Sequence, residues 1–73
     1  MNNIDIRNYI ISNFKDESIE KVRDSIETTI KERNEDALIG LGVLFELVWN
    51  SVTDGEKNNF LDIIMDKIKD LAS

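Results

Sequence analysis

The segment from Leu38 to Val52 constrains the fold of this chain most, because Glu46 is its single charged residue. On a helix, at about 100° per residue, most of its large side chains fall on one side. They are Leu38, Leu41, Phe45, Val48, Trp49 and Val52, with Leu44 and Leu47 extending the same side. Only a narrow strip with Glu46 and Asn50 stays polar. We therefore expect a central helix that neighbouring helices cover nearly all the way round.

The length of the chain limits how stable such a fold can be. Its 73 residues form one domain (1–73), and none is a cysteine, so disulfides and thiolate metal sites are excluded. A single core of this size supplies on the order of 3–5 kcal/mol. Good helix packing or oligomerisation must add to it. The apolar segment is shorter than the about 20 residues that span a membrane, and the amino terminus lacks a signal-peptide pattern, so we expect no membrane partner.

Capping residues and apolar spacing predict four helices. The first runs from about Ile4 to Phe14 with Asn2 or Asn3 as its cap, and the second follows a cap at Asp16 or Ser18. Asn34 is the predicted cap of the third helix. The motif Thr53-Asp54-Gly55-Glu56 is a capping box that starts the fourth. Apolar stripes mark the second helix (Ile19, Val22, Ile26, Ile30) and the fourth (Phe60, Leu61, Ile64, Ile68, Leu71).

Two glycines lie inside the third predicted helix. Gly40 and Gly42 each cost on the order of 1 kcal/mol against alanine, so a close contact should compensate. Two interpretations are open: another helix of the same chain approaches there, which we favour, or a helix of a second copy does.

The central segment resembles a known family. "LIGLGVLFELVW", Leu38 to Trp49, is similar to the signature of the small acid-soluble spore proteins of type I, short proteins of endospore-forming bacteria. The similarity extends to Ile4–Ile11 and to "GEKNNFLDII", Gly55 to Ile64. The family usually has proline where this chain has Ile39, so the third helix here can begin a turn earlier, near Asn34. The resemblance implies a protein made in the forespore and stored in the spore core, with no catalytic residue, cofactor or small-molecule substrate. It does not extend to the major spore proteins that coat DNA.

The balance of charges argues against direct DNA binding by this chain. Nine basic and fifteen acidic residues give a net charge of -6, and the basic residues are interleaved with acids. A duplex would be repelled rather than attracted. DNA binding remains a hypothesis only for the case that the folded chain brings five basic side chains together on one surface: Arg7, Lys15, Arg23, Lys31 and Arg33.

Catalysis and metal binding have little support in the residue types present. Histidine and cysteine, the commonest general base and the best nucleophile, are both missing. Two interpretations of Glu46 are open. Apolar surroundings could raise its pKa and make it chemically active, or it could lie at the rim of the core, paired with a lysine or a backbone amide, which we favour. Asp62, Asp66 and Asp70 form a straight ladder better suited to a solvated face than to Ca²⁺. We expect the side chains of Tyr9 and Trp49 to be anchors of the hydrophobic core.

The sequence thus predicts an all-α, small four-helix domain with a central apolar helix, with a homodimer as an open alternative. We expect a structural or protein-interaction role, with a second copy or another spore protein bound through Phe45, Val48, Trp49 and Val52. Two other functions are kept as alternatives: a nucleoid-associated protein, and an amino-acid store degraded on germination.

Overall fold

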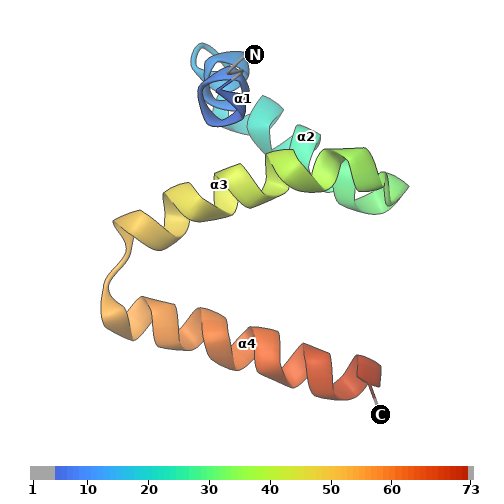
Figure 1. Ribbon diagram of the computed structural model, residues 1–73, viewed down its shortest axis with the longest axis vertical. Coiled ribbons are helices and arrows are strands. Elements are labelled where there is room, and N and C mark those ends of the chain that lie inside the picture. Colours follow the sequence, from blue (N-terminus) through green and yellow to red (C-terminus); the bar gives the residue numbers. More distant parts are fainter. Residues whose placement is uncertain (1–4, 73) are drawn as a thin grey trace.

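The computed structural model describes residues 5–72, and every regular element in this range is helical (Figure 1). The elements are α1 (Ile6–Phe14), α2 (Ile19–Glu32), the short 3-10 helix η1 (Glu35–Ala37), α3 (Leu38–Ser51) and α4 (Asp54–Ala72). The all-α prediction with four helices is confirmed.

Side-chain caps set the first two helix starts. The Asp5 carboxylate accepts a hydrogen bond from the backbone N–H of Asn8 at 3.2 Å, so α1 begins at Ile6 rather than Ile4. The caps predicted at Asn2 or Asn3 lie outside the described residues. Of the two candidates before α2, Ser18 is the cap, and its hydroxyl accepts from the N–H of Lys21 at 3.2 Å. Each cap satisfies an amide that has no partner within the helix.

The turn between α2 and α3 explains where the apolar helix begins. Arg33 ends α2 in the left-handed conformation, with φ 54°. Asn34 then accepts from the N–H of Asp36 at 2.9 Å and caps η1, which leads directly into α3 at Leu38. The predicted cap at Asn34 therefore starts a 3-10 turn, while the α-helix itself begins at Leu38 and not near Asn34.

The capping box at the start of α4 is confirmed. Glu56 Oε1 accepts from the backbone N–H of Thr53 at 2.9 Å, and the N–H of Glu56 donates to Thr53 Oγ1 at 3.2 Å. This reciprocal pair fixes the turn at Val52 and Thr53, where the chain reverses direction. With 19 residues α4 is about 28 Å long, against about 21 Å for the 14 residues of α3.

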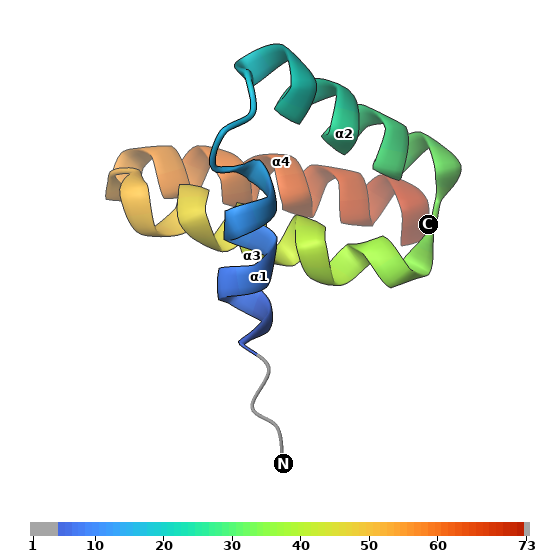
Figure 2. The ribbon, with the colours of Figure 1, turned by 90° about the horizontal axis from the view of Figure 1, so that it is seen from above.

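The helices are arranged openly around α3. Figures 1 and 2 show α1 crossing α3 on one side, while α4 leaves the turn and diverges from α3 like the second arm of a V. The radius of gyration is 14.4 Å, whereas a compact domain of 73 residues has about 11 Å. The chain is thus well short of full compaction.

Burial follows from this openness. Val43, on the α1 side of α3, is the only buried residue among those described. Leu38 is 60% exposed and Phe45 is 45% exposed, so the expectation that neighbours cover the central helix nearly all the way round is wrong. Tyr9, expected as a core anchor, is 64% exposed. A helical pattern fixes which sides are apolar, but it does not supply enough chain to cover every side.

Candidate interaction surface

An ion pair and a close helix contact hold α1 on α3. The Arg7 guanidinium donates from Nε to Glu46 Oε1 at 2.7 Å and from Nη2 to Glu46 Oε2 at 2.8 Å. Near Gly40, an added Cβ would meet Ile10 Cδ1 at 3.6 Å. This is ordinary van der Waals contact with a side chain, and no atom lies within 4 Å of a Cβ added at Gly42, so no close backbone approach within the chain accounts for either glycine.

Glu46 is an ionised partner in this pair. The hydrogen bond from Arg7, followed by the attraction of its charge, lowers the pKa of Glu46 below its usual value, and burial opposes this only in part. The same hydrogen bond raises the pKa of Arg7. The idea of a raised glutamate pKa is wrong. Pairing itself was expected, but the partner is an arginine from α1 rather than a lysine or a backbone amide.

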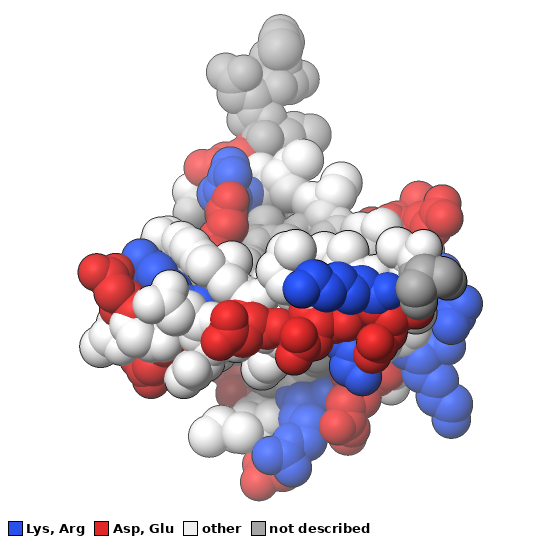
Figure 3. All heavy atoms as spheres, turned by 90° about the horizontal axis from the view of Figure 1, so that it is seen from below, with Lys and Arg blue, Asp and Glu red and all other residues white. Residues whose placement is uncertain are grey.

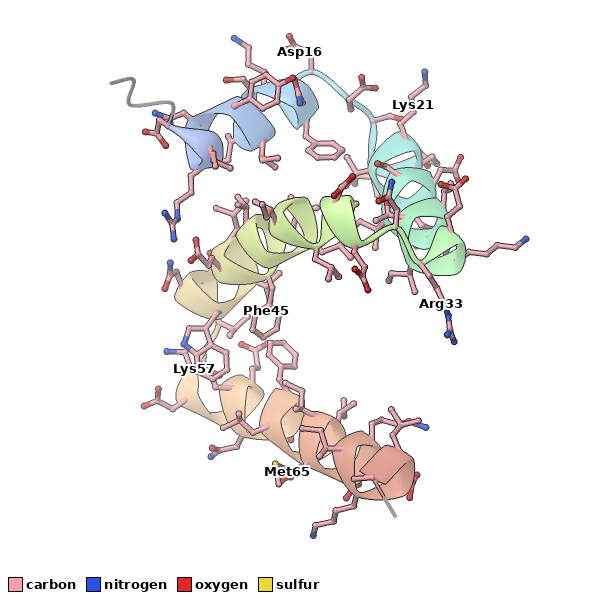
Figure 4. The ribbon with its side chains drawn as sticks, turned by 45° about the vertical axis from the view of Figure 1, so that its right-hand side comes forward. Asp16, Lys21, Arg33, Phe45, Lys57 and Met65 are labelled. Carbon is pink, nitrogen blue, oxygen red and sulfur yellow. The ribbon has the colours of Figure 1, made fainter. Side chains whose placement is uncertain are left out.

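An aromatic cluster joins α3 to the first half of α4. The Phe45 ring centroid lies 5.9 Å from that of Trp49 and 6.4 Å from that of Phe60, both in tilted geometry. Lys57 Nζ lies 5.2 Å from the centroid of the Trp49 ring, a cation–π distance. Figure 4 shows Phe45 and Lys57 between the two helices, near the turn that joins them. We call the arrangement of α3 and α4 the V. Its two arms are in contact only near the turn that joins them.

Beyond this cluster the V opens into an apolar cleft of about 460 Å³. Its lining residues are Phe45, Glu46, Trp49, Asn50, Leu61 and Ile64. Two of the four predicted interaction residues, Phe45 and Trp49, therefore lie in one cleft. Val48 is exposed and Val52 half-buried, and neither lines it. Whether any of the four contacts a partner stays a prediction.

The distal half of α4 adds apolar surface that the predicted interaction residues did not include. At about 100° per residue, Ile64, Ile68 and Leu71 continue the face on which Phe60 meets Phe45. Ile68 is 50% exposed and Leu71 is 86% exposed. The apolar stripe of this helix was visible in the sequence, but the sequence did not show that, among residues 5–72, no helix lies opposite its second half.

The outer face of α4 is acidic. Figure 3, viewed from the α4 side, shows a row of acidic side chains along this helix. Asp62 and Asp66 fall on this face, opposite the side that meets Phe45. No group of three or more potential metal ligands occurs among residues 5–72, and within the same range no helix is long and apolar enough to cross a membrane.

A second apolar cavity, of about 380 Å³, lies between α1, α2 and α3. Ile10, Phe14, Ile26 and Leu44 are among its lining residues. These side chains come from three apolar stripes that point toward one another. The stripes therefore meet as the sequence predicts, but they pack loosely.

The basic residues that DNA binding would require do not all face free solvent on one surface. Arg7 is bound to Glu46, and in Figure 4 Arg33 projects from the end of α2 away from the rest of the chain. Direct DNA binding stays an untested alternative.

Comparison with known proteins identifies close relatives in sporulating bacteria. The family described as "Small, acid-soluble spore protein I" matches residues 4–68. Among curated relatives with that same name, the one from Bacillus velezensis is 33% identical over 66 residues, which is 90% of this chain and 93% of the relative. Those from Bacillus licheniformis and Bacillus subtilis are each 32% identical over 66 residues, covering 90% of this chain and 94% and 93% of the relative. No solved structure matches the chain.

Proposed function

Because this chain belongs to the small, acid-soluble spore protein I family, we propose that it is a non-catalytic protein of the spore core that binds another polypeptide through the apolar surface of α3 and α4. Membership of the family supports the spore as the location of the protein. Its location in the spore core and its binding role are our proposals.

The observation that carries this proposal is the exposure of large apolar side chains on facing helices. Phe45 and Val48 on α3, and Ile64 and Ile68 on α4, are all exposed. Monomeric soluble proteins rarely leave contiguous apolar patches of this kind uncovered, and those that do use them for binding. A storage protein would need no such surface.

The absence of catalysis in this proposal is supported by residue chemistry. The sequence has no histidine and no cysteine, and the most interesting carboxylate, Glu46, is held ionised by Arg7. A catalytic site needs a general acid or base and a position for the substrate beside it. A single ion-paired carboxylate on a helix surface provides neither.

Site-specific photo-crosslinking inside intact spores tests the proposal. A photoreactive phenylalanine analogue replaces Val48, and a matched variant carries it at Arg23, on the charged surface of α2. We expect a polypeptide adduct from position 48 and little from position 23. Equal yields at both positions, or no adduct at position 48, would overturn the binding role.

A further inference from the structure

We propose that the occupant of the V between α3 and α4 is a second copy of this chain, with the two V-shaped hairpins interlocked about a two-fold axis. This inference rests on the proposed function and names its partner. In the dimer, the distal half of each α4 lies in the cleft of the other copy, so that four helices share one apolar core.

The exposed area of the chain matches what a dimer would bury. Its accessible surface is 6468 Å², whereas a compact monomer of 8.4 kDa exposes about 4,600 Å². The excess is on the order of 1,000–2,000 Å². Obligate dimers bury about 2,000–5,000 Å² in total, or about 1,000–2,500 Å² on each copy. One identical partner is therefore enough to remove the excess.

The two arms of the V are complementary to each other in shape and chemistry. The α3 arm offers an aromatic cleft with Phe45 and Trp49, and the α4 arm offers a projecting aliphatic ridge with Ile68 and Leu71 beyond this cleft. In a two-fold dimer each copy contributes both a cleft and a ridge, so every contact occurs twice. A different partner would have to supply both features on its own surface.

Charge is arranged in a way that lets identical acidic chains meet. Each copy carries a net charge of -6, so association requires the acids to stay outside the interface. Glu46, the one acid that lines the cleft, is neutralised by Arg7. Asp62 and Asp66 fall on the side of α4 opposite the face that meets Phe45, so they point away from the V. Lys57, over the Trp49 ring, is the only charge in the aromatic cluster that closes the vertex.

Sedimentation equilibrium of the full chain tests the dimer, with two substitutions matched in residue type and helix. Ile68→Asp places a charge on the inner face of α4, and Ile63→Asp places the same charge on a side of α4 about 140° away, where Ile63 is 61% exposed. We expect wild type and Ile63→Asp to sediment as dimers, and Ile68→Asp to raise the dissociation constant at least roughly tenfold. The conservative Ile68→Met should dimerise like wild type, which separates a lost interface from a lost fold.

Three outcomes overturn the inference. A wild-type chain that stays monomeric up to millimolar concentration excludes the dimer, and the binding role survives only if the Val48 crosslink in spores joins a different polypeptide. A trimer or a larger assembly excludes the two-fold arrangement. Equal weakening by Ile63→Asp and Ile68→Asp places the interface elsewhere on the chain.

Discussion

Arg7 and Glu46 are 39 positions apart in the sequence, yet they form two hydrogen bonds of 2.7 and 2.8 Å that tie α1 to the polar strip of α3. The bidentate geometry gives this exposed pair directional specificity. Because both side chains are well solvated, we expect the pair to orient α1 more than to stabilise it.

Stability should respond to pH through this pair. The pKa of Glu46 is lower in the folded chain than its usual value, so the stabilising contribution is present at neutral pH and is lost as the pH falls through the folded pKa. In Glu46→Gln this acid-side loss should be smaller than in wild type. Thermal melts from neutral to acidic pH measure it, with Glu27→Gln on the exposed face of α2 as the control. Identical pH profiles for wild type and Glu46→Gln would rule out the linkage.

The capping box should carry a measurable share of the stability of α4. Thr53→Ala removes the acceptor for the Glu56 N–H, and we expect a loss of about 0.5–2 kcal/mol in urea unfolding. Thr28→Ala, at an exposed position inside α2, should change the free energy of unfolding by less than about 0.5 kcal/mol. A Thr53 variant as stable as wild type would show that α4 does not depend on its cap.

Gly40 should tolerate a methyl group. The nearest atom to an added Cβ is Ile10 Cδ1 at 3.6 Å, which is normal contact, while alanine favours the helix by up to about 1 kcal/mol over glycine. Gly40→Ala should therefore raise the melting temperature. A lower melting temperature would mean that α1 sits closer to α3 in solution than in the structure.

Phe60 should be the main link between the arms of the V. Its ring lies 6.4 Å from that of Phe45, and Phe60→Ala removes this contact. We expect a loss of about 1–3 kcal/mol, below the full cost for a buried phenylalanine because the ring is half-buried. Emission of Trp49, the sole tryptophan, should shift to longer wavelength as α4 moves away. Ile19→Ala, on α2, is the control and should leave the emission unchanged.

Helix positions could be predicted from local chemistry, but packing could not. The Thr53–Glu56 box and the Ser18 cap act within a few residues, so the sequence alone indicates where α4 and α2 begin. Contact between Arg7 and Glu46 depends on how α1 crosses α3, which no local pattern specifies. Likewise, the stripe through Ile68 and Leu71 was evident, but a stripe does not reveal whether its own chain or another chain covers it.

Hydrogen exchange along α4, measured by mass spectrometry at nanomolar and at high micromolar concentration, tests the central claim most directly. The account predicts that the amides of residues 64–72 exchange quickly in the isolated chain, where no helix covers their apolar face, and become protected when the chain assembles. Equal protection at both concentrations would contradict it, because α4 would then be stabilised within a single chain.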